Sequence, residues 1–332
     1  MDITQVRTTQ FHDGSTDDIF ALTHDPLPDM QEGDVRIRMD TISLDPAMRG
    51  WTTNVKSYMP PVQPGDIMRC FGVAEVLESN SKYFQAGDWV TGFLGVQTHG
   101  ILNQRELRKI DLTYGEPKDF LSGLGMTGYT AYFGMTDIGK PKKGDTVVVS
   151  AASGAVGSVA SQIAKLAGAY VVGIAGGPEK CAFLKGTLKL DGVIDYKNED
   201  IYEALKRECP KGIDVYFDNV GGQTLEAAIS LANYQSQIVI CGAISQYGDF
   251  SAIQGPANFL KVISSSLKIQ GFTMKDYFHL IPEALKYLIA AKQEGKIVFR
   301  EHMLEGIENF GEAMKMVYAG KNHGKLLLKV AK

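Results

Sequence analysis

The fold of this chain is decided by Val147-Val148-Val149-Ser150-Ala151-Ala152-Ser153-Gly154-Ala155-Val156-Gly157. An apolar run typical of a buried strand leads into a turn, and Ser158–Leu166 then follows a helical pattern. A strand, this Ala-x-Gly-x-x-Gly turn and a helix together form a variant of the dinucleotide-binding fingerprint. We predict that Gly154 admits a pyrophosphate to the backbone and that Gly157 lets the helix pack closely on the strand. The N–H groups at the helix start would bind the phosphates.

One position departs from the fingerprint. Ala152 stands where the first glycine is usual, and a methyl group is tolerated there if φ stays negative. The alternative interpretation is a glycine-rich turn without a ligand. The strands and helices that follow this turn favour the cofactor site.

Strand-like and helical segments alternate from about residue 123 onward. The expected strands are Thr146–Ser150, Tyr170–Ala175, Gly192–Asp195, Ile213–Phe217, Gln237–Cys241 and Leu267–Phe272. The expected helices are Ala155–Leu166, Glu179–Lys185, Ile201–Arg207, Thr224–Leu231 and Tyr277–Lys292. This alternation predicts an α/β domain with a doubly wound parallel sheet, covered by helices on both faces.

The first 120 residues or so have a different pattern, with short strands separated by turns. In Asp34–Asp40, apolar and polar residues alternate with period two, as in a half-buried strand. Strands of this length and spacing predict a small barrel. The chain has 332 residues, which suits two domains. Its last strand-like run, Lys325–Val330, could extend the nucleotide domain or return to the first one.

Composition excludes several classes of protein. The net charge of −4 provides no overall positive field for nucleic acid or an anionic membrane. Met1–Gln5 lacks the pattern of a secretory signal, and no stretch approaches the roughly 20 apolar residues that cross a bilayer. The four cysteines are far apart and form no disulfide or zinc framework. We therefore expect a cytoplasmic protein that binds neither nucleic acid nor membrane.

The residues after the second expected strand indicate which cofactor is used. NAD is usually held by an acidic residue at the end of this strand, but the chain has Gly176-Gly177 there, and Lys180 follows. An ammonium group pairs with the 2′-phosphate of NADP, which an acid would repel. Tyr196 could hydrogen-bond the same phosphate or cover the adenine. Glu179 stands beside Lys180 and leaves a solvated lysine open as the alternative; we predict NADP.

A catalytic zinc site is not evident in the sequence. The six histidines form no His-Glu-x-x-His pattern and have no neighbouring cysteine. His99 is expected in a loop and the others on the surface. Without a Lewis acid, hydride addition to a conjugated alkene or a quinone is favoured over direct reduction of a simple carbonyl.

Over nearly its whole length the chain resembles the zinc-independent branch of the medium-chain dehydrogenase/reductases. This branch contains prostaglandin and leukotriene reductases, alkenal double-bond reductases and bacterial curcumin reductases. The matching motifs are Leu44–Arg49, Gly125–Gly134, Ala151–Gly157, Gln162–Lys165, Gly176–Lys180, Asp195–Lys197, Asp214–Gly222, Cys241–Tyr247, Gln270–Phe272 and Gly320–Lys325.

The resemblance implies a fold and a set of cofactor-binding residues. A GroES-like β-barrel catalytic domain would comprise residues 1–122 and 296–332, and a Rossmann domain residues 123–295, with the nicotinamide in the cleft between them. The implied NADPH-binding residues are Gly154, Ala155, Val156, Gly157, Lys180, Tyr196, Asn219, Cys241, Gly242, Ile244, Ser245, Tyr247, Phe272, Thr273, Met274 and Asn322. The family also suggests a homodimer formed near Leu267–Phe272.

The implied reaction is hydride transfer from NADPH to the β-carbon of an enal or enone. Tyr247 is the first candidate donor to the developing enolate oxygen, and Tyr58 is a second catalytic candidate that would cap the pocket. For either tyrosine, packing alone is the alternative. Two other functions stay open: an NADPH:quinone reductase on the same scaffold, and an NADPH-binding sensor without turnover.

Overall fold

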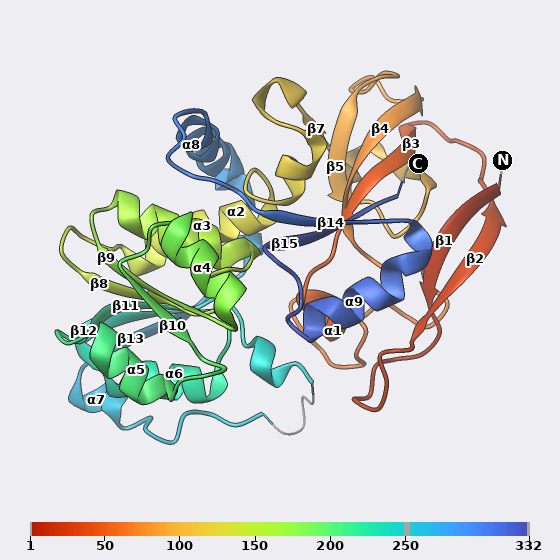
Figure 1. The fold of residues 1–332 in the computed structure, drawn as a ribbon. Helices are drawn as coiled ribbons and strands as arrows, with labels where there is room; N and C mark the ends of the chain where they lie inside the picture. Colours follow the sequence, from red (N-terminus) through yellow and green to blue (C-terminus); the bar gives the residue numbers. More distant parts are fainter. Residues whose placement is uncertain (1, 249–252, 331–332) are drawn as a thin grey trace. The chain divides into compact units, whose positions relative to one another are not determined.

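The computed structural model describes residues 2–248 and 253–330, and the chain divides into two compact units. Met1–Ser122 and Glu301–Lys332 form the first unit and Gly123–Arg300 the second (Figure 1). The second crossing between the units therefore follows Arg300 and not residue 295. Residues just before Arg300 are bonded to the second unit: the Val298 N–H donates to Gln162 Oε1 (2.8 Å), and Gln162 Nε2 donates to the Val298 carbonyl (2.9 Å).

The second unit is built on a six-stranded sheet with the order β10-β9-β8-β11-β12-β13, in which all neighbours run parallel. Every residue of β8 is buried, as expected of a parallel strand covered on both faces. The strands are β8 (Thr146–Val149), β9 (Tyr170–Ala175), β10 (Gly192–Asp195), β11 (Ile213–Asp218), β12 (Ala232–Ile240) and β13 (Lys268–Gly271). The predicted doubly wound sheet is confirmed.

Helices cover both faces of this sheet. Helix α2 (Met126–Phe133) packs with α3 (Ala155–Leu166) and with α8 (Ile281–Gln293), and α5 (Ile201–Glu208) packs with α6 (Gly222–Ser230). The two groups lie on opposite sides of the strands in Figure 1. Two further helices are α4 (Pro178–Gly186) and α7 (Lys261–Ser264). Apolar side chains from both helices and strands close the core between them.

One expected helix is divided in two. The segment predicted as Tyr277–Lys292 contains a 3-10 turn, η6 (Met274–Leu280), followed by α8 from Ile281. Proline has no N–H to donate inside a helix but is well tolerated in its first turn. Pro282 is the second residue of α8, so the α-helix begins there rather than running through it.

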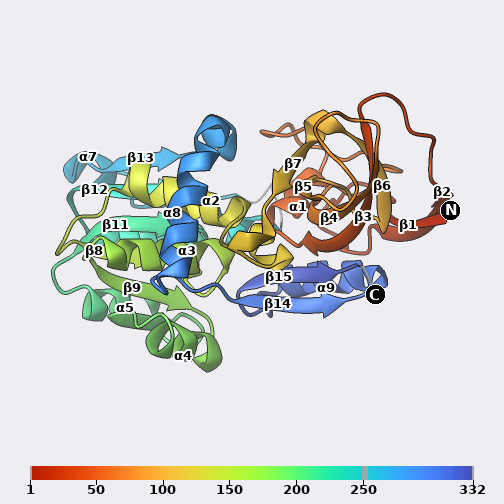
Figure 2. The ribbon, with the colours of Figure 1, turned by 90° about the horizontal axis from the view of Figure 1, so that it is seen from above.

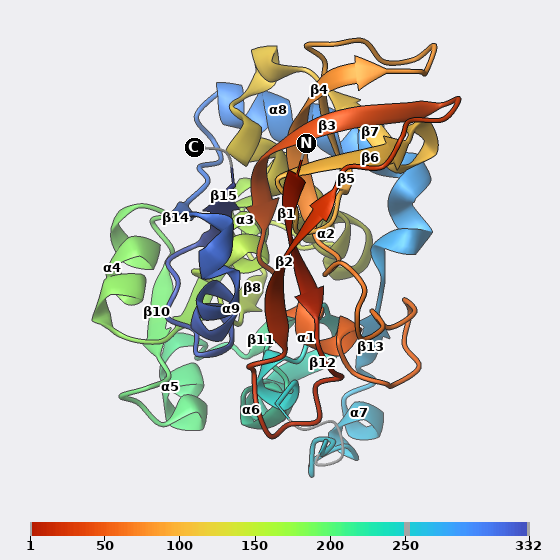
Figure 3. The ribbon, with the colours of Figure 1, turned by 90° about the vertical axis from the view of Figure 1, so that its right-hand side faces the viewer.

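The first unit contains a seven-stranded sheet with the order β14-β15-β3-β4-β5-β7, and β6 also pairs with β3. Its strands are β3 (Asp34–Ser43), β4 (Phe71–Ser79), β5 (Trp89–Phe93), β6 (His99–Asn103), β7 (Leu107–Ile110), β14 (Glu301–Glu305) and β15 (Lys325–Lys329). Its helices are α1 (Ala47–Trp51) and α9 (Phe310–Tyr318). Strands β1 (Asp2–Thr8) and β2 (Phe20–Pro26) form a separate antiparallel pair (Figure 3).

The C-terminal strand completes the first unit. Strand β15 pairs with β3 in antiparallel and with β14 in parallel orientation, and α9 packs beside them (Figure 2). The open question about Lys325–Val330 is thereby answered in favour of the first domain. Two expectations about histidines are wrong: His99 begins strand β6 rather than lying in a loop, and His12 is buried rather than on the surface.

No helix in the described part of the chain combines the length and the apolar character needed to span a bilayer.

Candidate functional site

The parallel sheet has one point at which its strand order reverses, between β8 and β11. In open parallel sheets, ligands bind beyond the carboxyl ends of the strands at this point. Here hydrogen bonds join the loop after β8 to the end of β11 and to the loop that follows it. The Ser150 N–H donates to the Phe217 carbonyl (3.1 Å), the Asn219 N–H to Ser150 Oγ (2.8 Å), and Asn219 Nδ2 to the Ser150 carbonyl (2.8 Å).

The loop after β8 leads into α3 as the fingerprint predicts. Gly154 is the N-cap, with an extended backbone and no side chain, so the first-turn N–H groups of Ala155, Val156 and Gly157 open toward the loop. A Cβ on Gly157 would lie 2.3 Å from the Ala151 carbonyl oxygen, closer than any real contact. Helix α3 can therefore approach β8 this closely only with glycine at that position.

The backbone at Ala152 meets the condition stated for a methyl group at this position, because Ala152 is not among the residues with positive φ. Ala151, the residue before it, has φ of 48° and is the left-handed residue of this turn. Left-handed backbone costs an L-residue other than glycine roughly 1–2 kcal/mol, so this loop stores a small strain.

A buried carboxylate organises the loop after β11, and the sequence analysis missed it. Asp218 is fully buried, and its Oδ1 accepts from Tyr216 Oη (2.8 Å), Ser150 Oγ (3.0 Å) and the Val220 N–H (3.0 Å). The Gly221 N–H donates to both carboxylate oxygens (3.0 and 3.1 Å). Burial raises the pKa of Asp218 above its usual value, and these hydrogen bonds oppose the shift. Asp218 thus fixes both loops at the reversal point.

The residues after β9 are those predicted to bind the adenosine end of the cofactor. A Cβ on Gly176 would lie 2.7 Å from the Tyr196 ring, so the ring rests directly on the glycine backbone. Tyr196 itself is half exposed. The Gly177 N–H donates to Asp195 Oδ1 (2.8 Å), which ties the loop after β9 to the end of β10. Only glycine leaves this space for the aromatic ring.

Lys180 lies in the first turn of α4, close to two further cations. Burial lowers the pKa of Lys180, and the nearby charges of Lys197 and Arg300 lower it further, while Glu179 opposes the shift. Arg300 Nη2 is 3.2 Å from Glu179 Oε1, so the only acid in this turn faces an arginine. The charge of Glu179, the acid that left the choice between NAD and NADP open, is therefore partly neutralised by Arg300.

The loop Cys241–Tyr247 after β12 rests on the loop after β11. The N–H groups of Cys241 and Gly242 donate to the Asp218 carbonyl (2.8 and 3.1 Å). The Ile244 N–H donates to the Asn219 carbonyl (3.1 Å) and the Ser245 N–H to that of Val220 (3.2 Å). These bonds bring six predicted site residues together: Asn219, Cys241, Gly242, Ile244, Ser245 and Tyr247.

Tyr247 turns back onto its own loop. Its hydroxyl oxygen accepts from the Ala243 N–H (3.2 Å) and lies 3.3 Å from the Cβ position of Gly242. The bond from the Ala243 N–H fixes the position of the phenolic oxygen. The phenol is thereby held above the Gly242 backbone, at the carboxyl end of the sheet.

The residues after β13 are differently placed. The Phe272 ring points into the helix layer, because the Cβ position of Gly134 lies 2.9 Å from Phe272 Cζ and 2.7 Å from Phe217. It also meets Tyr277 edge to face at 6.1 Å. Thr273 Oγ1 faces Asp276 (3.5 Å) and Met274 begins η6. The side chain of Phe272 therefore packs against the helix layer and is partly buried there.

Tyr58 lies in the first unit, on the loop after α1. Its hydroxyl oxygen accepts from Trp51 Nε1 (3.2 Å), and 46% of the residue is exposed. The Arg69 guanidinium lies 5.8 Å from the Trp51 ring, and Arg69 Nη1 donates to the Pro60 carbonyl (3.0 Å). The loop is thus fixed at both sides of Tyr58, and its hydroxyl has a defined position.

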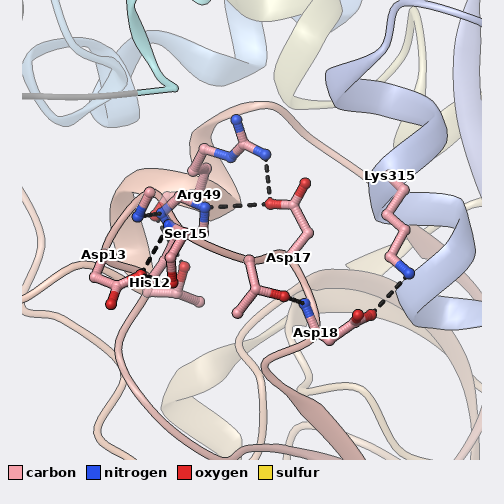
Figure 4. A network of polar contacts seen from close by, with 10 residues as sticks. His12, Asp13, Ser15, Asp17, Asp18, Arg49 and Lys315 are labelled. Carbon is pink, nitrogen blue, oxygen red and sulfur yellow. Dashed lines mark hydrogen bonds and ion pairs between the residues drawn. The ribbon is translucent and has the colours of Figure 1, made fainter.

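Helix α1 itself is anchored by the polar cluster in Figure 4. Asp17 Oδ1 accepts from Arg49 and lies 3.2 Å from His12 Nε2. Asp18 Oδ1 pairs with Lys315 of α9 (2.7 Å). The Arg49 guanidinium also lies 3.7 Å above the Tyr318 ring. The cluster fixes the loop between β1 and β2 against α1 and α9, and Arg49 of the motif Leu44–Arg49 has a structural role here.

Comparison with known proteins shows which family this architecture represents. The family model described as N-terminal domain of oxidoreductase matches residues 6–110, and that described as zinc-binding dehydrogenase matches residues 155–290. The NADPH-dependent curcumin reductase of Escherichia coli is 39% identical over 325 residues, which cover 96% of this chain and 94% of the relative. The NADP(+)-dependent 2-alkenal reductase of Nicotiana tabacum is 40% identical over 303 residues, covering 90% and 88%.

The chain belongs to the medium-chain dehydrogenase/reductase family, in the branch of the curcumin and alkenal reductases. A solved structure agrees: CurA from Vibrio vulnificus in complex with NADPH matches with a TM-score of 0.93 and 39% identity over 99% of both chains. This confirms the family and the fold predicted from the sequence.

The predicted site residues of this reductase fall into separate groups. The phosphate loop, Asn219 and Cys241–Tyr247 meet at the reversal point of the sheet, while Lys180 and Tyr196 flank the neighbouring strands β9 and β10. Asn322 lies in the first unit, where its Nδ2 donates to the Gly324 carbonyl (2.7 Å). The roles of Asn322 and Tyr58 in binding stay predictions.

Within residues 2–248 and 253–330 of the reductase, no group of three or more His, Cys, Asp or Glu side chains is placed to hold a metal ion.

Proposed function

We propose that this protein uses NADPH to reduce the carbon–carbon double bond of α,β-unsaturated aldehydes and ketones, by hydride transfer to the β-carbon. The observation that carries the proposal is the loop Cys241–Tyr247. It presents a tyrosine hydroxyl at the same strand ends that carry the phosphate loop. An anion site and a fixed hydrogen-bond donor on one sheet edge are what a hydride transfer to an enone requires.

The residues of the second unit fit NADPH. Gly157 has no room for a Cβ, so the first turn of α3 lies close against the loop after β8, and Gly154 carries no side chain at the start of α3. Both features suit a pyrophosphate at the helix N-terminus. Tyr196 on Gly176 suits the adenosine end, where Lys180 would pair with the 2′-phosphate. When bound, NADPH supplies the hydride for the reaction.

Tyr247 would stabilise the charge that the reaction creates. Hydride addition at the β-carbon places negative charge on the carbonyl oxygen as an enolate. The Tyr247 oxygen is held by the Ala243 N–H at 3.2 Å, so the hydroxyl that we propose as the donor is positioned before the charge develops. A phenolic O–H is a hydrogen-bond donor to such an oxygen.

An acceptor panel tests the proposed reaction. The purified protein is given NADPH with an enone, its saturated ketone or a quinone, with and without a chelator, and the loss of NADPH absorbance is followed. We expect turnover of the enone alone, insensitive to the chelator, with the saturated ketone as product. Turnover of the quinone alone would support a quinone reductase. Tight NADPH binding without turnover of any acceptor would support a sensor.

The role of Tyr247 is tested by Tyr247→Phe. Loss of one preorganised donor should lower kcat for the enone by about 10²-fold. Tyr234→Phe is the matched control, because Tyr234 is 70% exposed on β12. A Tyr247→Phe enzyme with the kcat and KM of the control would remove Tyr247 from the mechanism.

We also propose a homodimer formed through the free edge of the sheet. All residues of β13 are exposed, and within the described chain β13 pairs only with β12. Leu260 and Ile263 nearby are each 76% exposed. An unpaired edge strand with apolar neighbours favours pairing with a second copy. Sedimentation should give twice the chain mass of 36.2 kDa, and a mass of 36.2 kDa would contradict the dimer.

The predicted cytoplasmic location stays a proposal. Its support is that Cys70, Cys181, Cys209 and Cys241 are all free thiols, as suits a reducing compartment.

A further inference from the structure

Arg300 lies far from the dinucleotide-binding fingerprint in sequence, but close to Lys180, the residue predicted to bind the 2′-phosphate. Arg300 is the last residue of the second unit and is 121 positions from Glu179 in sequence. Its Nη2 is 3.2 Å from Glu179 Oε1, and its guanidinium carbon lies 4.7 Å from the centre of the Phe183 ring. Both partners belong to α4, the helix that begins with Lys180 in its first turn. Arg300 is therefore fixed against the N-terminal half of α4.

Three cations converge at this place. Lys180 is about half buried, and the charges of Lys197 and Arg300 both act to lower its pKa. Lys197 follows Tyr196, whose ring rests on Gly176 at the end of β9. The repulsion between like charges raises the free energy of the protein, and a bound dianion would relieve it.

The acids nearby offset this charge only in part. Glu179 is 67% exposed, so its pair with Arg300 contributes little stability. Asp195 accepts from the N–H groups of Gly177 (2.8 Å) and Lys197 (3.1 Å) and from Asn198 Nδ2 (2.8 Å), and these bonds together with the charge of Lys197 lower its pKa. Two carboxylates against three cations leave a net positive charge for an incoming anion.

We propose that Arg300 is a specificity-determining residue for the cofactor, forming with Lys180 and Lys197 a three-cation site for the 2′-phosphate of the adenosine ribose. The inference rests on the proposed use of NADPH. A phosphate on the 2′ carbon of the ribose carries about two negative charges at neutral pH. The planar guanidinium can donate two parallel hydrogen bonds to it, which an ammonium group cannot. Phe183 holds the guanidinium plane in place, so little side-chain entropy is lost when the phosphate binds.

A structural role is the competing explanation. In that case Arg300 would only fasten α4 through Glu179 and Phe183, and the effect of losing it would not depend on the 2′-phosphate. The two explanations differ in the affinity for NADH, which lacks this phosphate, and in the effect of removing Glu179.

The test is equilibrium titration of the full-length protein with NADPH and with NADH, followed by cofactor fluorescence, without any acceptor. In Arg300→Gln, the Kd for NADPH should rise about tenfold, as for the loss of one charge-assisted hydrogen bond, while the Kd for NADH should change less than about twofold. Glu179→Gln removes the same ion pair from the other side and should leave NADPH binding unchanged or tighter.

Two results would overturn the inference. One is an equal weakening of NADPH and NADH in Arg300→Gln, and the other is a loss of NADPH affinity in Glu179→Gln equal to that in Arg300→Gln. Arg300→Lys keeps the charge but not the planar fork, and should weaken NADPH about threefold; it carries the test if Arg300→Gln does not fold. A wild-type protein that binds NADH as tightly as NADPH would instead contradict the proposed cofactor itself.

Discussion

Gly157 offers a sharp test of the phosphate loop, because the space at this position is smaller than a methyl group. In Gly157→Ala, the new Cβ would lie 2.3 Å from the Ala151 carbonyl oxygen and 2.9 Å from the Ala152 Cα. Both are backbone atoms that no side-chain rotation can remove. Ordinary contacts of carbon begin near 3.4 Å, so the start of α3 must move by about 1 Å.

The size of the effect follows from this movement. Overpacking of this kind costs about 1–3 kcal/mol, which corresponds to a lower melting temperature by roughly 2–4 °C per kcal/mol for a unit of this size. A shift of about 1 Å also takes the first-turn N–H groups out of hydrogen-bonding distance of a phosphate. Since a hydrogen bond to a charged group contributes about 1.5–3 kcal/mol, NADPH affinity should fall at least tenfold.

The assay is thermal unfolding of the apoprotein together with NADPH titration. Gly154→Ala is the matched control in the same loop, because its Cβ would lie 3.1 Å from the same carbonyl oxygen and requires only a small adjustment. It should lose much less stability than Gly157→Ala, and it serves as a control for stability alone, because Gly154 itself belongs to the proposed pyrophosphate site. Equal losses of melting temperature in the two variants, or a Gly157→Ala protein that melts and binds like the wild type, would refute the reasoning.

Three further substitutions test the network around the site. Lys325→Met should destabilise the first unit by about 3 kcal/mol, because the Asp45 carboxylate, 2.5 Å from the fully buried Lys325 ammonium group, loses its cation. Lys329→Met breaks the more exposed pair of Lys329 with Asp40 and should cost less than about 1 kcal/mol. Equal losses in melting temperature for the two variants would contradict this. Burial raises the pKa of Asp218, so its contribution to stability is present below the pKa of the unfolded state and is lost as pH rises through the pKa of the folded state. The free energy of unfolding of the wild type, measured relative to Asp218→Asn, should therefore fall between acidic and neutral pH. A difference that rises over this range would show that the pKa is shifted in the opposite direction. Ala151→Gly should stabilise the protein by about 0.5 kcal/mol in denaturant titration. The relief of the left-handed strain at φ 48° should exceed the entropy that glycine adds to the unfolded chain. A destabilised variant would mean that the turn is unstrained.

The fold was accessible from the sequence because its strands are short apolar runs with local boundaries. Thr146–Val149 and Tyr170–Ala175 are marked by β-branched residues before glycine-containing turns, and both match the prediction within one residue. Pro282 was overlooked, although a proline inside an expected helix indicates where it must begin. The crossing after Arg300 could not be placed, because it depends on the pairing of Val298 with Gln162, which no local pattern reveals.

Only the part of the candidate site that consists of neighbouring residues could be predicted from the sequence. The turn at Gly154–Gly157 follows a motif whose residues are adjacent in sequence, so the motif alone predicts it. Asp218 was read as part of a family motif, but its bonds to Ser150 arise from the pairing of β8 with β11, which are 68 residues apart. Arg300 reaches Glu179 over 121 residues. Partners of this kind become visible only when the sheet order is known.

The most direct measurement of the central claim is the position of the transferred hydride. The protein is incubated with a simple enone and NADPH that carries deuterium at the transferable position of the nicotinamide, and the product is analysed by mass spectrometry and NMR. We predict a saturated ketone with one deuterium on the β-carbon. Deuterium on the carbonyl carbon of an allylic alcohol, or no incorporation into the enone while a quinone is reduced, would contradict the proposed function.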